Sequence, residues 1–169
     1  MRTGAKLLIL LSFILIAQSV HAQNFGEGFY RLTTQWQGDG KSLDVVNDGK
    51  NDQLQLAKTA KVSGQYWKIT PIADTKFYRL TTDWLGTGKS LDVLNDGKNN
   101  KLWLADTADV TGQYWMITST GDGYYRLTTQ WQGEGKSLDV VNDGKNTQVQ
   151  LAKSEAVSGQ SWKITLIKK

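Results

Sequence analysis

Apolar and polar residues alternate along short stretches of this chain, and each of these stretches returns later in the sequence. In FYRLTTQW (29–36), every second side chain would point to the same face. In KSLDVVN (41–47), Leu43 and Val45 would share one face and Asp44 would lie on the other. A period of two residues is typical of β-strands. Because no helical period follows the first 22 residues, the pattern predicts an all-β protein.

The chain contains three copies of one unit of about 47 residues. Over 42 aligned positions, the first unit is identical to the third at 34 positions and to the second at 31. Self-similarity at a fixed period of this length indicates a repeat architecture. The units are named repeat 1 (about 29–76), repeat 2 (about 77–123) and repeat 3 (about 124–169).

Each repeat reads as four short strands separated by turns rich in Gly, Asn and Asp. In repeat 1, the first two strands are joined by QGDGK (37–41), and NDGKN (47–51) separates the second from the third. Asn, Asp and Gly tolerate the left-handed backbone conformations that such turns use. The remaining strands are expected at QLQLA (53–57) and QYWKIT (65–70). The sequence therefore predicts a four-stranded module repeated three times.

Three architectures compete for three such modules. A propeller usually needs four or more blades, and an open solenoid needs atypical polar repeats at its ends. Here the two terminal repeats are more alike than either is to the middle one. Closing three equivalent units on one another removes exposed sheet edges. We therefore predict a β-trefoil, a barrel of twelve strands with pseudo-threefold symmetry.

Two motifs recur in register in all three repeats. Each repeat ends in Gln-x-Trp and carries SLDV about 22 residues earlier. The Gln-x-Trp pairs are Gln65 with Trp67, Gln113 with Trp115, and Gln160 with Trp162. This combination resembles the ricin B-chain family of carbohydrate-binding β-trefoils, the R-type lectins, and the resemblance covers essentially all of residues 23–169. It implies a β-trefoil fold and a glycan or polysaccharide as partner.

The Gln-x-Trp motif is interpreted as structural. Its two residues lie two apart in an expected strand, so that they share one face, where a buried amide could tie down a nearby turn. The three tryptophans are expected in the core, and replacing one with Ala should cost about 3 to 5 kcal/mol.

The SLDV aspartates are the first candidates for sugar binding. They point away from the Leu and Val face of their strand, and the resemblance implies that they accept hydrogen bonds from sugar hydroxyls. The alternative is a role in stabilising the adjacent turn. These aspartates are Asp44, Asp92 and Asp139, with Asn47, Asn95 and Asn142 close by as further donors and acceptors. Gln55 and Gln150 stand where the family often supplies another hydroxyl partner, and Trp103 replaces this glutamine in repeat 2.

Two positions depart from the family pattern in every repeat. The usual aromatic platform is replaced by alanine, at Ala57, Ala105 and Ala152. The residue before Gln-x-Trp, often Asn in sugar-binding units of the family, is Gly64, Gly112 and Gly159. Two expected ligand contacts are thus absent.

A tryptophan in the first turn of each repeat could supply the missing stacking face. These residues are Trp36, Trp84 and Trp131. A second interpretation is that alternation with Leu32 turns them inward as part of the core. The sequence leaves both interpretations open.

Repeat 2 differs from its neighbours in charge. Gln35, Lys58 and Lys61 of repeat 1 become Asp83, Asp106 and Asp109. Together with Trp103, these changes predict that its site differs in specificity or binds no sugar.

Residues 1–22 have the features of a secretory signal peptide. Arg2 and Lys6 precede an apolar run of about eleven residues that ends in SVHA. A run of this length is too short to span a bilayer. We expect a secreted or periplasmic protein that begins at Gln23, has one β-trefoil domain over 23–169, spans no membrane, and works as a monomer with several binding sites.

Charge and composition exclude several function classes. The leader holds two of the 20 basic residues and none of the 16 acidic ones, which leaves a charge of +2 without a basic stripe. No nucleic-acid partner is therefore expected. The only histidine is His21 and there is no cysteine, so the usual general bases, thiol nucleophiles and transition-metal ligands are missing after residue 22. We expect no catalysis, cofactor or metal; NDG loops can hold Ca²⁺, but their spacing does not match an EF-hand.

Two functions remain. The first is a secreted lectin with up to three weak, repeated sugar sites. The second is a β-trefoil that acts through protein contacts, as an inhibitor or adhesin, with its repeats kept from a recent duplication.

Overall fold

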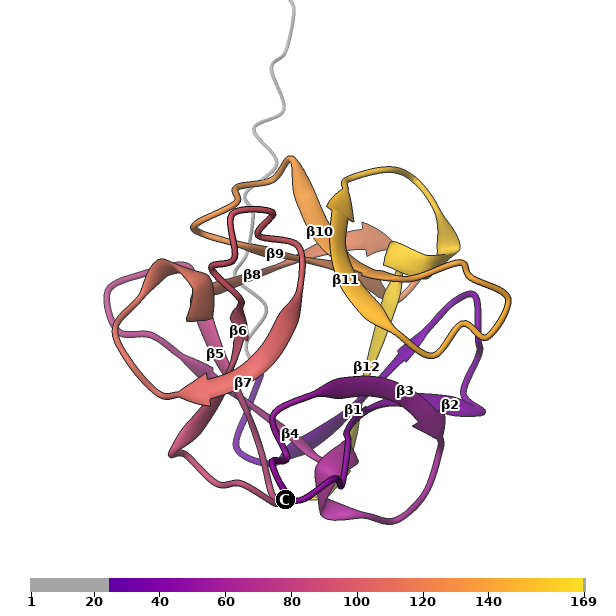
Figure 1. Ribbon diagram of the computed structural model, residues 1–169, viewed down its shortest axis with the longest axis horizontal. Coiled ribbons are helices and arrows are strands. Elements are labelled where there is room, and N and C mark those ends of the chain that lie inside the picture. Colours follow the sequence, from indigo (N-terminus) through magenta and orange to yellow (C-terminus); the bar gives the residue numbers. More distant parts are fainter. Residues whose placement is uncertain (1–24, 169) are drawn as a thin grey trace, which may run out of the picture.

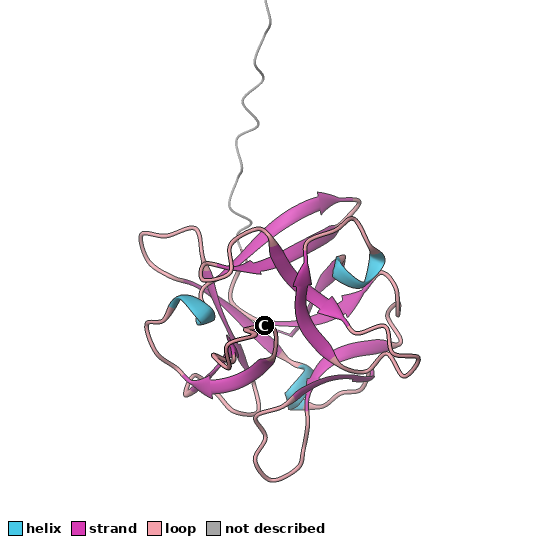
Figure 2. Ribbon diagram, turned by 45° about the horizontal axis from the view of Figure 1, so that its top comes forward, coloured by secondary structure: helices cyan, strands magenta, loops and turns pink. Residues whose placement is uncertain are grey.

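Twelve strands and three short helical turns make up the described part of the chain. The computed structural model describes residues 25–168, so the predicted signal peptide and the expected start at Gln23 lie outside the described residues. The strands are β1 (Phe29–Thr34), β2 (Lys41–Val45), β3 (Leu54–Lys58), β4 (Trp67–Pro71), β5 (Tyr78–Thr82), β6 (Lys89–Val93), β7 (Leu102–Asp106), β8 (Trp115–Gly121), β9 (Tyr124–Thr129), β10 (Lys136–Val140), β11 (Val149–Lys153) and β12 (Trp162–Lys168). The 3₁₀ turns are η1 (Ser63–Gln65), η2 (Thr111–Gln113) and η3 (Ser158–Gln160), drawn in cyan in Figure 2.

Six strands close into a barrel and six form hairpins around its axis. The barrel order is β1-β12-β9-β8-β5-β4, and the hairpins are β2-β3, β6-β7 and β10-β11. Each repeat supplies four strands, and the three hairpins surround one central axis in Figure 1. The prediction of an all-β, threefold β-trefoil is confirmed. Among the residues described, no helix is long and apolar enough to cross a bilayer.

The core is built from the alternating apolar positions of all three repeats. Leu32, Leu43 and Trp67 are fully buried, as are their counterparts in the other repeats. The indole nitrogen of Trp67 donates a hydrogen bond of 3.0 Å to the carbonyl of Leu43. Equivalent bonds join Trp115 to Leu91 and Trp162 to Leu138, both at 2.9 Å. The indoles thus fill the core and also satisfy a backbone carbonyl of the hairpin above it.

The glutamine of the Gln-x-Trp motif lies in a 3₁₀ turn and not in the strand that we predicted. Gln65 is the last residue of η1, and β4 begins only at Trp67. The side-chain amide of Gln65 takes the place of backbone strand pairing at this point. Its oxygen accepts from Ala60 N at 2.8 Å, and its nitrogen donates to Lys58 O at 2.9 Å. Both motif residues are still buried, and the amide ties down the turn after β3.

Two contacts on the pseudo-threefold axis hold the repeats together. On the hairpin side, the third strand of each repeat donates to the loop before the equivalent strand of the preceding repeat. These bonds, of 2.7 to 2.8 Å, join Leu56 N to Thr147 O, Leu104 N to Asp52 O and Leu151 N to Asn100 O. At another point, Phe25 packs edge-on against one tyrosine from each repeat. The ring centroids of Tyr30, Tyr78 and Tyr125 lie 5.6, 5.5 and 6.0 Å from that of Phe25.

Candidate functional site

The pairing of the second and third strands sets the SLDV aspartates beside the predicted glutamines. In β2-β3, Asp44 lies opposite Gln55. In β10-β11, Asp139 lies opposite Gln150. Directly paired residues project from the same face of a sheet, close enough for their side chains to share a ligand. In β6-β7, Trp103 occupies the glutamine position opposite Asp92.

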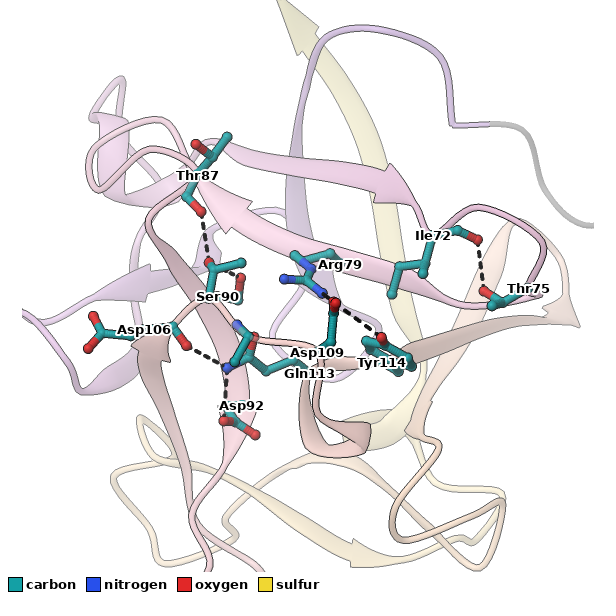
Figure 3. A network of polar contacts seen from close by, with 12 residues as sticks. Ile72, Thr75, Arg79, Thr87, Ser90, Asp92, Asp106, Asp109, Gln113 and Tyr114 are labelled. Carbon is teal, nitrogen blue, oxygen red and sulfur yellow. Dashed lines mark hydrogen bonds and ion pairs between the residues drawn. The ribbon is translucent and has the colours of Figure 1, made fainter.

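The carboxylate of each aspartate is fixed by the backbone and, in repeats 1 and 2, by the motif glutamine. Asp44 Oδ1 accepts from Val45 N at 2.8 Å, and Oδ2 accepts from Gln65 Nε2 at 3.1 Å. Figure 3 shows the same arrangement in repeat 2, where Gln113 reaches both Asp92 and the carbonyl of Asp106. Each carboxylate oxygen has a further lone pair for a ligand hydroxyl. The local turn role and a binding role are therefore compatible at these positions.

Glycine before the motif glutamine leaves room for this carboxylate. A Cβ on Gly64 would stand 2.6 Å from Asp44 Oδ1, and one on Gly159 would stand 2.8 Å from Asp139 Oδ1. Contacts this short would force the carboxylate to move. The departure from the family's usual Asn is thus explained by the tight placement of the aspartate.

The hairpin tryptophan of each repeat lies at the aspartate of the preceding repeat. A hollow of about 270 Å³, the Asp44 hollow, is lined by Asp44, Val45, Asn47, Gln55, Val62, Ser63, Gly64 and Trp84. The Asp139 hollow, of about 380 Å³, is lined by Trp36, Asp139, Val140, Asn142, Val157, Ser158 and Gly159. In repeat 2, Trp131 comes close to Gly112, so that it takes the same place beside Asp92. Trp36 therefore lies beside Asp139 of repeat 3 and not beside Asp44 of its own repeat.

Backbone bonds between neighbouring repeats produce this crossed arrangement. The amide before each hairpin tryptophan donates to the residue after the 3₁₀ turn of the preceding repeat. These bonds join Asp83 N to Tyr66 O at 2.8 Å, Gln130 N to Tyr114 O at 2.9 Å and Gln35 N to Ser161 O at 2.9 Å. All three tryptophans are half-buried and pack against the edge of the core. They are neither fully exposed nor core residues, so each of the two open interpretations holds in part.

A valine in each repeat belongs to this surface and was missed from the sequence. Val62, Val110 and Val157 precede the 3₁₀ turns and are 43 to 44% exposed. Val62 lines the Asp44 hollow, and Val157 lines the Asp139 hollow. An exposed apolar residue kept in three polar loops is the signal that could have revealed it.

The NDG loops are stabilised by their own aspartates. Asp48 Oδ1 accepts from Lys50 N at 3.1 Å and from Asn51 N at 2.9 Å, and Asn51 has a left-handed φ of 58°. These backbone N–H groups, that of Asn51 above all, lower the pKa of the Asp48 carboxyl below its usual range. Asp96 and Asp143 are bound in the same way. The loops leave Asn47, Asn95 and Asn142 exposed close to the SLDV aspartates. Within residues 25–168, no group of three or more Asp, Glu, His or Cys could hold a metal ion.

The aspartate of repeat 3 differs electrostatically. Burial raises the pKa of the Asp139 carboxyl above its ordinary value of 3.8, against the opposing effect of the hydrogen bond from Val140 N. In this repeat, Ser137 donates to Gln160 Oε1 at 2.7 Å. In repeat 1, the equivalent Ser42 bonds instead to Thr59, at 2.6 Å.

Repeat 2 carries acidic residues that are partly neutralised by ion pairs. Asp106 lies 2.8 Å from Lys89, and Asp109 lies 3.1 Å from Arg79. Trp103 lines a separate hollow of about 470 Å³ that reaches residues of all three repeats. Its buried indole nitrogen finds no hydrogen-bond partner within the described part of the chain. The polar partner that Gln55 offers in the Asp44 hollow is therefore missing beside Asp92.

Comparisons with known proteins give structural neighbours alone. No protein-family profile matches the chain, and no curated protein does. A designed threefold-symmetric protein, ThreeFoil, is 25% identical, with a TM-score of 0.70 over 83% of this chain and 100% of its own. The ricin B-like lectin of Macrolepiota procera, solved with lactose, is 16% identical, with a TM-score of 0.69 over 86% of this chain and 99% of its own. An exo-β-1,3-galactanase from Clostridium thermocellum is 24% identical, with a TM-score of 0.67 over 84% of this chain and 31% of its own. The six-stranded barrel, the three hairpins and these neighbours together show that the chain has a β-trefoil fold like that of the ricin B-like lectin.

Proposed function

We propose that this protein is a lectin whose sugar sites lie at the junctions between its repeats. The Asp44 hollow carries the proposal. It sets a fixed carboxylate and the side chains of Asn47 and Gln55 beside the indole of Trp84 and the exposed Val62. A sugar ring presents hydroxyls at its edge and C–H groups on its faces, so it needs both kinds of surface in one place.

The structural neighbours support carbohydrate as the ligand class. The Macrolepiota procera lectin was solved with lactose, and the Clostridium protein is named as a galactanase. Because both are of low sequence identity to this chain, they support a shared fold and point to no particular sugar. The assignment of residues therefore rests on the hollows of this chain.

The three junctions should not bind equally. The Asp44 and Asp139 hollows combine a carboxylate, an asparagine and a tryptophan. The junction at Asp92 has Trp131 and Asn95, but Trp103 replaces the glutamine. We therefore propose two similar sites and a third with altered specificity or no sugar binding. Sites on one rigid body gain avidity on a glycan surface without any new contact.

The proposal includes an exported, monomeric protein without catalytic activity. The leader predicts export, and internal closure of the barrel makes a second copy unnecessary for folding. Cell fractionation and light scattering on the purified protein test these two points. Hydrolysis of a bound glycan at a rate above background would contradict the non-enzymatic assignment.

The binding test compares carboxylates inside and outside the junctions. Asp44→Asn/Asp92→Asn/Asp139→Asn removes the three proposed hydroxyl acceptors with little change in shape. The matched control is Asp74→Asn, at an exposed turn residue with a left-handed φ of 59°, a conformation that Asn also tolerates. A glycan array followed by calorimetry should show binding by the parent and the control, and a loss of about tenfold or more in the triple variant.

Two results would reject parts of this proposal. A folded parent that binds no sugar on the array would leave protein contacts as the better function. Sugar binding that persists unchanged in the folded triple variant would keep the lectin function but move its sites elsewhere.

A further inference from the structure

We propose that repeat 3 holds a second kind of site, a pocket for a phenol ring, which the other two repeats fill with a tyrosine of their own. The proposal does not depend on sugar binding. It starts from the residue between Gln and Trp of the repeated motif, which is Tyr66 in repeat 1, Tyr114 in repeat 2 and Ser161 in repeat 3.

In repeats 1 and 2, the tyrosine ring packs on an arginine of the first strand. The guanidinium carbon of Arg31 lies 5.9 Å from the ring centre of Tyr66, and that of Arg79 lies 5.8 Å from the ring centre of Tyr114. Figure 3 shows the second case, where Asp109 accepts from both Arg79 and the tyrosine hydroxyl, at 3.1 and 3.3 Å. A guanidinium over an aromatic face is a favourable arrangement.

In repeat 3, the arginine is kept and the ring is lost. Arg126 occupies the corresponding place in β9, and its Nη2 donates to Glu155 O at 2.9 Å, as Arg31 donates to Ala60 O at 2.7 Å. With serine at 161, a hollow of about 570 Å³ opens beside this arginine, lined among others by Gln35, Tyr124, Arg126, Thr128, Glu134 and Ser161. We call it the Ser161 hollow.

A buried hydroxyl in this hollow has no hydrogen-bond partner among residues 25–168. Thr128 is 3% exposed, and its Oγ1 makes no hydrogen bond to any described residue. The equivalent Thr33 hydroxyl in repeat 1 donates to Asp39 at 3.3 Å. Buried polar groups are normally paired, so an unpaired one that lines a hollow is a candidate ligand contact. The Arg126 Nε is also buried and unpaired among residues 25–168, as is that of Arg31, so the hydroxyl is what sets repeat 3 apart.

These features select a planar ring that carries a hydroxyl. The ring would stack on Arg126, as the tyrosines do in the other repeats, and its hydroxyl would find Thr128 or the carboxylate of Glu134 as partner. Such a ring can come from a small phenolic compound or from a tyrosine side chain of another protein. Both sources share the phenol chemistry, and two probes separate them.

The test uses p-cresol and N-acetyl-tyrosinamide, followed by amide NMR shifts of the whole protein. For p-cresol, we expect saturable shifts around Thr128 and Ser161, with a dissociation constant on the order of 1 mM for a ligand of this size. Tighter binding of N-acetyl-tyrosinamide would assign the pocket to a protein tyrosine, and tighter binding of p-cresol to a small phenolic compound.

The repeats supply the matched variants. Ser161→Tyr restores the residue of repeats 1 and 2, so it should fill the hollow and weaken p-cresol binding at least tenfold. Thr128→Val keeps the shape of the side chain and removes its hydroxyl, and it should weaken binding several-fold. Asp74→Asn, at an exposed turn residue that does not line the Ser161 hollow, should leave p-cresol binding unchanged. Absence of saturable shifts in the parent, or unchanged binding in folded Ser161→Tyr, would overturn the proposal.

Discussion

Two sets of three tryptophans recur in this chain with the same period, and they have different surroundings. Trp67, Trp115 and Trp162 are fully buried, and each donates its indole N–H to a leucine carbonyl. Trp36, Trp84 and Trp131 are half-buried at the junctions, where each faces the aspartate of another repeat. Repetition alone therefore does not reveal what a residue does. Burial and the identity of the neighbouring repeat separate the residues that stabilise the fold from those available to a ligand.

Truncating one tryptophan of each set should give two clearly different losses of stability. Trp115→Ala removes a fully buried indole and its hydrogen bond, and should lower the free energy of unfolding by about 3 to 5 kcal/mol. Trp84→Ala removes a half-buried ring and should cost about 1 kcal/mol. Urea denaturation monitored by circular dichroism measures both. Similar losses for the two variants would show that the hairpin tryptophans are also mainly structural.

Sugar affinity should depend on the tryptophan that the next repeat contributes to a hollow, and not on the tryptophan of the same repeat. In an Asp92→Asn/Asp139→Asn background, which leaves only the Asp44 hollow intact, Trp84→Ala should weaken sugar binding about tenfold, or about 1.4 kcal/mol. Trp36→Ala should change it less than twofold, because Trp36 lines the Asp139 hollow. Calorimetric titration with the best sugar from the array decides between them. The opposite ranking would restore the grouping by repeat that the sequence suggests.

The glycine before the motif glutamine tests how tightly the aspartate is held. Gly64→Ala places a Cβ 2.6 Å from Asp44 Oδ1, so the carboxylate must turn away and weaken its bond from Val45 N. We expect several-fold weaker sugar binding and a stability loss of about 1 kcal/mol. The control is Gly88→Ala, since a Cβ there meets no atom within 4 Å. Equal effects of the two substitutions on binding would show that Gly64 has no special role in the placement of Asp44.

A smaller effect is expected for Asp139, the aspartate of repeat 3, whose contribution to stability should depend on pH. Because burial raises the pKa of the Asp139 carboxyl, the folded state holds this proton more tightly than the unfolded state does. Stability from this residue is then lost as the pH rises from about 3.8 through the raised pKa. Melting temperatures of the parent minus those of Asp139→Asn should fall over this window. A difference that rises with pH there would contradict the direction of the shift.

The fold could be predicted because its determinants are local and repeated. Three local features act within one repeat: the alternation at Leu43 and Val45, the turn residues, and the buried Gln-x-Trp motif. With three copies of the repeat, the exposed edges of the sheets are covered when the copies close on one another. The carboxylate and carboxamide of the site were predictable for the same reason. Asp44 and Gln55 meet through a hairpin within one repeat.

The rest of the site depends on contacts between repeats, which the order of the sequence does not contain. Trp84 reaches Asp44 because the amide of the residue before it, Asp83, bonds to Tyr66 O after the 3₁₀ turn of the preceding repeat. The role of Gly64 depends on a distance of ångström scale between a backbone and a carboxylate. The exchange of tyrosine for Ser161 was visible in the sequence, but its meaning needed the arginine that lies beneath the ring in the other repeats.

The crossed junctions also bear on how such a chain can change by duplication or deletion. A complete hollow takes its carboxylate from one repeat and its indole from the next, and the third hollow closes the circle by using Trp36 from the first repeat. A separate 47-residue unit would hold two halves of different sites and no whole one. The hollows would form only after three copies had assembled into a ring. Fusion into one chain makes that assembly independent of protein concentration, so that all three junctions form whenever the barrel folds.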